Sequence, residues 1–268
     1  MKMSIHHETT YRYTEPLNYS IQQLRLTPRL DSHQRTISWD IAAPGALHRF
    51  ADACGNITHI LTINQHSTEV RIVAEGVVEA MPLDRGRLKD NGALSPLVFT
   101  MPTRLTQETE RITDFAHTNL KSGGGTSQFL DLAQAIRGAV MYRSGSTAVT
   151  STAGEALELG NGVCQDHVHL FIACCIAVGI PARYVSGYID TDNGAHAASH
   201  AWVDVWTDDG DFSGWASIDV TNAIFASDGH CRLAVGRDYD AASPIRGVRR
   251  GGGVESLGVD VRVEQADQ

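Results

Sequence analysis

The chain has 268 residues, of which 42% are hydrophobic, 20% charged and 7% aromatic. This composition is that of a globular protein with a sizeable core, and it excludes disordered, collagen-like and disulfide-scaffold proteins. Residues 1–100 contain ten basic and ten acidic side chains, whereas residues 101–268 contain 12 and 21, so the net charge of −9 lies in the second part. We therefore expect two modules, neither with the basic surface that nucleic acid or an anionic membrane requires.

The N-terminal sequence and the cysteines bear on the compartment. No apolar run suited to a secretion signal or a membrane span follows Met1, so we expect a cytoplasmic protein. The number of cysteines is odd, two are adjacent and none forms a CxxC pair: Cys54, Cys164, Cys174, Cys175 and Cys231. This pattern favours reduced thiols over disulfides or a structural zinc site.

The first 80 residues alternate between apolar and polar side chains. The alternation covers residues 5–13, 36–41, 57–63 and 70–78, and it uses mainly Thr, Ile, Val and Tyr. Such a period of two predicts antiparallel strands with one buried face. Residues 81–103 contain three prolines and are expected to connect this β-rich domain, residues 1–100, to a second domain, residues 101–268.

The second domain begins with helical patterns and ends with strands. Apolar stripes predict helices from about residue 106 to 120 and from 129 to 142, and Thr152 with Glu155 has capping-box spacing before a short helix. The apolar run 170–178 predicts a further helix. Residues 183–219 return to strand-like alternation, as do residues 257–263 near the end of the chain.

Cys164 is the most informative residue for chemistry. It follows Gly160-Asn161-Gly162-Val163 and precedes the apolar helix, so it is expected in the first helical turn. Free backbone N–H groups and the helix dipole favour a thiolate there, and the same N–H groups can donate to an oxyanion. From these residues alone, a buried small side chain at a helix start is an equal alternative.

A nucleophilic cysteine requires a base and a group that orients the base. His200 begins one predicted strand, and Asp219 lies on the next strand along the chain. A helix-start cysteine facing His and Asp on neighbouring strands would form a thiol–imidazole–carboxylate triad. The spacing alone does not establish that Cys164, His200 and Asp219 meet.

These motifs, taken in order, resemble the transglutaminase-like superfamily of cysteine enzymes. The similarity is greatest to bacterial members often described as cysteine proteases. It extends over nearly the whole chain, through residues 7–13, 25–28, 142–147, 162–166, 179–188, 200–202, 219 and 236–239. The sequence departs from the family pattern at Val220, Ile176 and His167, where Pro, Arg and an aromatic residue are usual.

The resemblance implies an α+β fold. Its papain-like, transglutaminase-like core packs a Cys-bearing helix on an antiparallel sheet and follows an N-terminal antiparallel β-sandwich-like domain. It also implies acyl transfer at amide bonds of a peptide or protein through a thioester, without cofactor or metal. Cys164 would be the nucleophile, His200 the general base and then acid, and Asp219 the orienting group. We favour hydrolysis; protein-glutamine transamidation and a non-catalytic binding protein that retains the fold are the alternatives.

The remaining candidates have structural interpretations. His196 and His200 have an H-x3-H spacing, but the segment is expected to be loop and strand, which argues against zinc. His169 is expected to pack or to hydrogen-bond, and Tyr142 to lie in the core. Asp166 is expected to be a carboxylate that the helix start favours. The acidic residues of 208–211 are expected to form a solvated turn, since the EF-hand Glu is absent.

Overall fold

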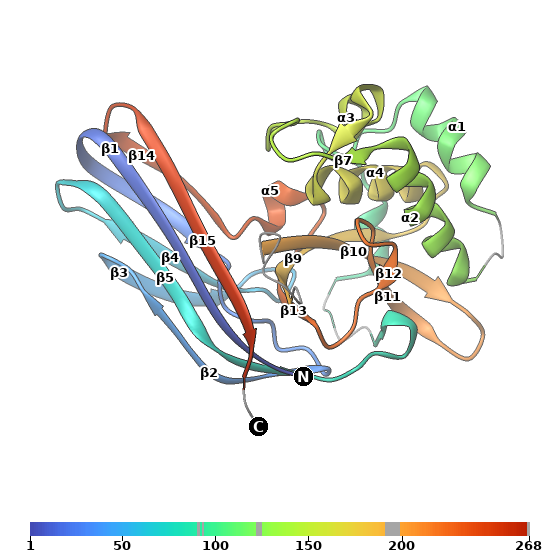
Figure 1. Ribbon diagram of the computed structural model, residues 1–268, viewed down its shortest axis with the longest axis horizontal. Coiled ribbons are helices and arrows are strands. Elements are labelled where there is room, and N and C mark those ends of the chain that lie inside the picture. Colours follow the sequence, from blue (N-terminus) through green and yellow to red (C-terminus); the bar gives the residue numbers. More distant parts are fainter. Residues whose placement is uncertain (90–91, 93, 122–124, 191–198, 267–268) are drawn as a thin grey trace.

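The computed structural model describes residues 1–89, 92, 94–121, 125–190 and 199–266. The described chain forms two main antiparallel sheets, and a layer of helices covers one face of the second sheet (Figure 1). The predicted α+β class is thereby confirmed. Within the described residues, we find no helix with the length and apolar character needed to cross a membrane.

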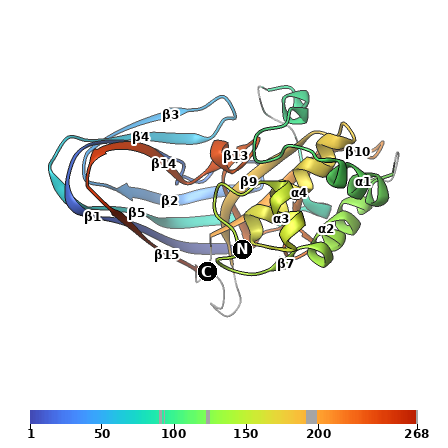
Figure 2. The same ribbon diagram turned by 90° about the horizontal axis from the view of Figure 1, so that it is seen from above.

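The first sheet is built around one long strand. Its order is β2-β5-β1-β4-β3, with two further strands on β1, and its members are β1 (Lys2–Leu24), β2 (Gln34–Ala42), β3 (Ala46–Ala51), β4 (Ile57–Ile63), β5 (Ser67–Ala80), β14 (Ile245–Gly251) and β15 (Glu255–Gln265). The first half of β1 pairs with β5 and β15, and the second half pairs with β4 and β14. The two halves contribute to two layers (Figure 2) that enclose Leu17, Leu24, Leu61, Val70 and Ile72. This is the sandwich-like arrangement expected for the N-terminal region.

The C-terminal strands β14 and β15 lie in the first sheet. Both pair with β1, although residues 245–265 belong to the predicted second domain. An alternating pattern predicts a strand with one buried face and does not specify its partner. Without these two strands, β1 would present an unpaired edge along much of its length. Residues 87–88 cross in the other direction, as β6 pairs with β11 of the second sheet.

The second sheet positions the candidate catalytic residues. Its order is β12-β11-β10-β9-β13, and its members are β6 (Arg87–Leu88), β9 (Ala182–Ile189), β10 (Ser199–Asp208), β11 (Ser213–Asp219), β12 (Ile224–Phe225) and β13 (His230–Gly236). Side chains alternate between the faces of a strand. On β10, Ala201, Val203 and Val205 join the helix-side core, whereas Trp202 packs in a separate cluster on the opposite face.

The helices form a layer over that sheet: α1 (Glu110–Asn119), α2 (Ser127–Ala139), α3 (Ala153–Leu159), α4 (Cys164–Ala177) and the single turn α5 (Tyr239–Ala242). The short segments are β7 (Met141–Tyr142), β8 (Asn161–Gly162), η1 (Asp84–Gly86) and η2 (Pro96–Thr100). The predicted Thr152–Glu155 capping box is present. α4 is buried along most of its length between the other helices and the sheet, which explains its nearly continuous apolar sequence.

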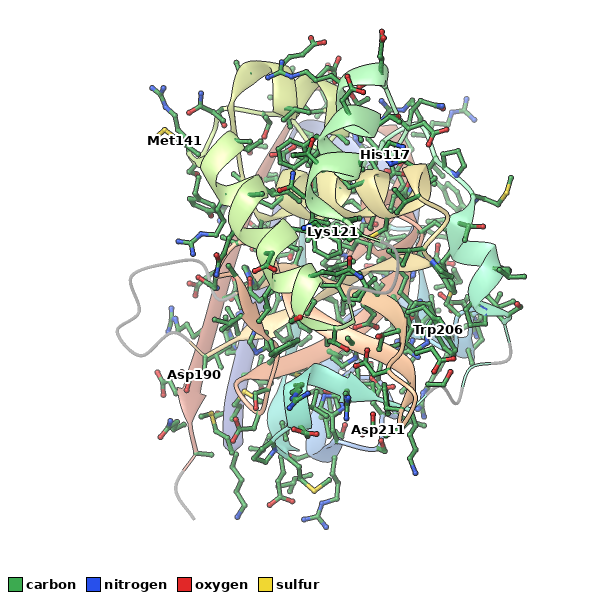
Figure 3. The ribbon with its side chains drawn as sticks, turned by 90° about the vertical axis from the view of Figure 1, so that its right-hand side faces the viewer. His117, Lys121, Met141, Asp190, Trp206 and Asp211 are labelled. Atoms are coloured by element: carbon green, nitrogen blue, oxygen red, sulfur yellow. The ribbon has the colours of Figure 1, made fainter. Side chains whose placement is uncertain are left out.

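A side view shows how the two layers are stacked. His117 of α1 lies above the sheet, whose Trp206 is lower in the view, as is Asp211 of the turn after β10 (Figure 3). β10 runs beneath α4, so the first turn of α4 and the start of β10 can contribute to one site.

Candidate active site

A tight turn places Cys164 at the first residue of α4. Gly160 ends α3 in the left-handed conformation with φ of 67°. The Asp166 carboxylate accepts hydrogen bonds from the Val163 N–H at 2.8 Å and from the Thr147 hydroxyl at 2.6 Å. A Cβ atom on Gly162 would lie 2.8 Å from the Asp166 Cβ, so this approach requires glycine. Asp166 therefore stabilises the helix start, as its position in the sequence predicts.

His200 and Asp219 lie within hydrogen-bonding distance of each other. The two residues come from the adjacent antiparallel strands β10 and β11. His200 Nε2 is 2.9 Å from Asp219 Oδ2, and the Asp219 side chain is completely buried. Because Asp219 occupies Nε2, Nδ1 is the ring nitrogen that remains for Cys164.

The electrostatics couple Cys164 to this pair. Burial alone would lower the pKa of His200, but hydrogen bonds to Asp219 and to the Cys164 side chain raise it to about 10. Burial likewise opposes ionisation of Asp219, yet its contacts with His200 and His230 hold the pKa of the carboxyl well below its ordinary value. The site therefore favours a charged imidazolium between the sulfur and the carboxylate.

A second histidine, which no motif in the sequence marks, contacts Asp219. His230, the first residue of β13, has its Nε2 3.2 Å from Asp219 Oδ2. The Ser227 N–H donates to His230 Nδ1 at 3.3 Å, so Nε2 is the ring nitrogen that donates to the carboxylate. Asn222 completes the set, since its side-chain amide donates to Oδ2 at 2.7 Å and its backbone N–H to Oδ1 at 3.1 Å.

Trp202 packs against both histidines. Its ring is stacked on His200, with centroids 6.3 Å apart and an angle of 29° between the planes. It meets His230 edge-on, at 5.2 Å and 78°. The indole is completely buried, so it restricts the orientations of the two imidazoles that it packs against.

The other histidines have structural contacts. His167 Nδ1 is 3.0 Å from the Thr221 hydroxyl, and its Nε2 donates to the Val140 carbonyl at 2.9 Å. His169 accepts from the Tyr239 N–H at 3.1 Å, and burial lowers its pKa to about 4. His196 lies outside the described residues, so the H-x3-H spacing has no structural counterpart here. Elsewhere in the described chain, no three His, Cys, Asp or Glu side chains are grouped to hold a metal ion.

The remaining cysteines and Tyr142 also differ from the candidate nucleophile. Cys174, Cys175 and Cys231 are buried, and burial raises their pKa values, whereas Cys54 and Cys164 are partly exposed. Tyr142 is 50% exposed, which corrects the expectation of a core tyrosine. Only two residues of β7 precede the loop there, so its ring lies over His167 at a centroid distance of 6.3 Å and not inside the sheet.

The acidic turn after β10 forms ion pairs with Arg87. The Arg87 guanidinium is 3.1 Å from an Asp209 oxygen and 3.4 Å from an Asp211 oxygen. Asp211 is exposed, in keeping with the predicted solvated turn, while the Asp209 side chain is largely enclosed. The turn therefore ties β6 to the second sheet.

Comparison with protein families assigns both parts of the chain. Residues 3–79 match the bacterial transglutaminase-like N-terminal region, and residues 109–220 match the transglutaminase-like superfamily. The chain belongs to the transglutaminase-like superfamily. Cys164, His200 and Asp219 all lie within the second match, as the resemblance of the motifs led us to expect.

Individual relatives extend the similarity over the whole chain. An uncharacterised protein of Mycobacterium leprae is 29% identical over 278 residues, covering 98% of each chain. An uncharacterised protein of Mycobacterium tuberculosis is 30% identical over 269 residues, covering 90% of this chain and 85% of the relative. Among solved structures, a "Putative Cysteine Protease" from Cytophaga hutchinsonii aligns with a TM-score of 0.79 and 22% identity, over 100% of this chain and 91% of the other. That structural likeness supports the fold.

Proposed function

We propose that this protein catalyses cysteine-dependent acyl transfer at amide bonds of a peptide or protein, with hydrolysis as its main reaction. Cys164 is the nucleophile, His200 the general base and then acid, and Asp219 the group that orients His200. The observation that carries the proposal is the 2.9 Å contact between His200 Nε2 and Asp219, on a ring that also interacts with Cys164.

The proposed steps follow from the positions of the three groups. His200 takes the thiol proton, and the sulfur attacks the amide carbonyl to give a tetrahedral oxyanion. The first N–H groups of a helix lack intrahelical acceptors, and that of Cys164, the first residue of α4, can donate to this oxygen. The C–N bond then breaks, His200 protonates the leaving amine, and a thioester to Cys164 remains. Water attacks the thioester with His200 again acting as base, which releases the acid and restores the thiol.

Asp219 contributes by fixing the imidazole and stabilising its charged form. Its carboxylate is buried and accepts hydrogen bonds from His200, His230 and Asn222, so its position does not depend on His200 alone. A carboxylate held in this way keeps Nδ1 of His200 directed at the sulfur throughout the reaction. Its charge also favours retention of the proton by the imidazole after the thiol has ionised.

Selective alkylation tests the proposed nucleophile. Iodoacetamide at pH 6, followed by peptide mass spectrometry, should modify Cys164 at least about tenfold faster than Cys54, because imidazolium stabilises the reacting thiolate. Cys54 is the matched control, as it is also partly exposed, while burial and Asp52 raise its pKa. His200→Ala should remove most of the rate advantage of Cys164.

The outcomes distinguish catalysis from a binding role. His48→Ala, which replaces an exposed histidine on β3, should leave the alkylation of Cys164 unchanged. Equal, slow labelling of Cys164 and Cys54 in the unmodified protein would contradict the proposed thiol activation and favour a non-catalytic protein that retains the fold.

A further inference from the structure

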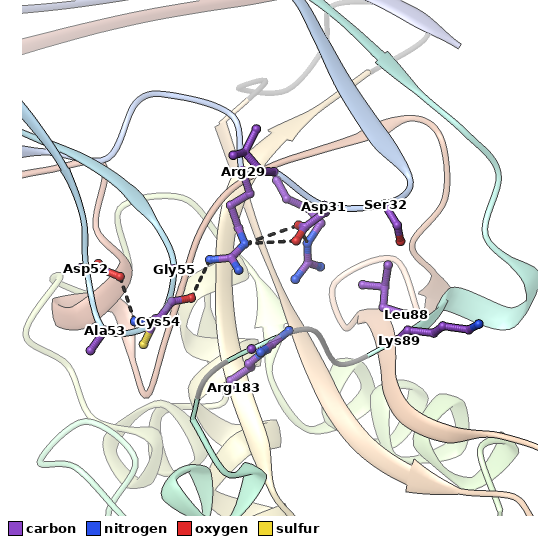
Figure 4. A pocket seen from close by; sticks show the side chains of 13 residues that line it. Arg29, Asp31, Ser32, Asp52, Ala53, Cys54, Gly55, Leu88, Lys89 and Arg183 are labelled. Carbon is purple, nitrogen blue, oxygen red and sulfur yellow. Dashed lines mark hydrogen bonds and ion pairs between the residues drawn. The ribbon is translucent and has the colours of Figure 1, made fainter.

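A polar cavity lies between the two sheets, on the side of the core sheet away from α4. Its volume is about 300 Å³. The loops after β1 and β3 contribute Arg29, Asp31 and Cys54, and the core sheet contributes Arg183 from β9 and Arg232 from β13 (Figure 4). Cavities at such junctions between modules are common sites for small ligands.

The cavity has an excess of positive charge in an otherwise acidic protein. Arg29, Arg183, Arg232 and Lys89 line it. Asp31 and the buried Asp204 neutralise only two of these four cations. Asp52 adds no free anion, because its carboxylate already pairs with Arg25 and accepts the N–H groups of Cys54 and Asn56.

The three arginines differ in how far their donors are used. Arg232 donates from Nε to Asp31 at 2.8 Å and from both terminal nitrogens to Asp204, so its guanidinium is fully engaged. Arg183 donates from Nε to Asp204 at 2.9 Å. Among the described residues, its two terminal nitrogens have no acceptor. Arg29 uses Nε on Asp31 and Nη1 on Cys54 O and Asn56, which leaves Nη2 unused on the same basis.

The unused donors are held in place and largely withdrawn from bulk water. The side chains of Arg29 and Arg183 are only 10% and 11% exposed. The Arg183 guanidinium also lies 4.1 Å from the centroid of the Trp215 ring, which fixes its plane. Burial lowers the pKa of Arg183; Asp204 opposes this, and repulsion from Arg232 and Arg29 adds to it. Both residues line the cavity, where a second negative group would supply acceptors for the donors that Asp204 and Asp31 leave unused.

We propose that this cavity binds a small oxyanion with two or more negative charges, such as inorganic phosphate or a small polycarboxylate. The planar fork of Arg183 matches two oxygens of such a group, and Arg29 lines the same cavity from the loop after β1. The bound anion would bridge the N-terminal loops and the core sheet. This site is separate from the proposed triad and does not depend on its activity.

Thermal unfolding and calorimetry with defined probes test the site. Sodium phosphate and sodium citrate are titrated separately into the full-length protein, with sodium chloride of equal ionic strength as the reference. A saturable rise in Tm is expected with at least one probe and not with chloride, because an anion bound to the folded state stabilises it. A response to phosphate alone or to citrate alone identifies which oxyanion the cavity accepts.

Three variants locate the effect. Arg183→Lys keeps the positive charge but removes the planar guanidinium, and it should weaken anion binding about tenfold or more. Lys89→Gln changes an exposed side chain, which leaves the fold intact, and it should weaken anion binding about threefold. Arg87→Gln, in β6 and paired with the acidic turn, is the control and should leave binding unchanged. No saturable effect beyond chloride, or equal binding in the unmodified protein and the Lys89→Gln and Arg183→Lys variants, would overturn the proposal.

Discussion

The core sheet carries two buried carboxylates on one face, and their surroundings differ. Asp219 accepts hydrogen bonds from two imidazoles and an amide, groups that can exchange protons or reorient. Asp204, on the adjacent strand, is held by Arg183 and Arg232, which remain charged throughout the physiological range. The comparison teaches that the same face of one sheet can support a titratable site at one end and a permanent ion-pair network at the other.

The loss of the proposed nucleophile should have the largest effect on activity. Cys164→Ala should lower amide or ester hydrolysis by roughly 10⁴-fold or more, because no thioester can form. The measurement is kcat/KM on a panel of peptide amides and esters, with circular dichroism to check the fold. Cys54→Ala should keep activity within about twofold; a comparable loss in both variants would assign the effect to the fold.

The buried ion pairs of Asp204 with Arg183 and Arg232 should contribute strongly to the stability of the fold. Asp204→Asn leaves Arg183 and Arg232 without their shared buried anion and should lower the free energy of unfolding by about 3–5 kcal/mol. Urea denaturation measures this change. Asp260→Asn, which breaks an exposed pair with Arg262, should have no measurable effect. If the two variants unfolded at the same urea concentration, the predicted contribution of the buried Asp204 ion pairs to stability would be contradicted.

His230 should act as a positioning residue for the His200–Asp219 pair. His230→Phe removes one donor from Asp219 and should reduce kcat/KM about tenfold, the range found when such supporting hydrogen bonds are lost. It should also shift the pH profile of Cys164 alkylation. His230→Gln, which can still donate to the carboxylate, should restore most of the rate. Identical pH profiles for His230→Phe and the unmodified protein would limit His230 to packing.

The raised pKa of His200 predicts a pH dependence of stability. His200 has a pKa of about 10 in the folded protein and about 6.5 when unfolded, so the folded state binds the proton more tightly. Its stabilising contribution is complete below pH 6.5 and is lost as the pH rises to about 10. The free energy of unfolding, measured by urea denaturation, should fall less steeply over this window in His200→Gln. Parallel curves for the two proteins would contradict the assignment.

The sequence predicted where helices, strands and catalytic motifs lie along the chain. It did not predict which strands pair with each other. The alternation of residues 5–13 and 57–63 predicted strands, and Cys164, His200 and Asp219 stood in recognisable motifs. The pairing of β14 and β15 with β1 was not predictable, because period two specifies a buried face and not a neighbour. Their register depends on contacts more than 200 residues apart in sequence.

His230 and the arginine cavity escaped prediction for a related reason. His230 reaches Asp219 from β13, a strand that joins the sheet beyond β9, and no local motif marks it. Asp204 and Arg232 did leave a signal, as single charges within otherwise apolar strands. A charge at such a position predicts either an exposed face or a buried partner, and only the packing of the N-terminal loops on the sheet decides between them.

Direct detection of the acyl-enzyme tests the central claim. The protein is mixed with a peptide ester, quenched in acid within seconds, and its intact and peptide masses are measured. The account predicts one added acyl group on Cys164, absent from Cys164→Ala, and accumulating in His200→Ala only slowly. Release as free acid identifies hydrolysis, and release onto an added primary amine identifies transamidation. Turnover of the ester with the acyl group on another residue, or undiminished turnover by Cys164→Ala, would contradict it.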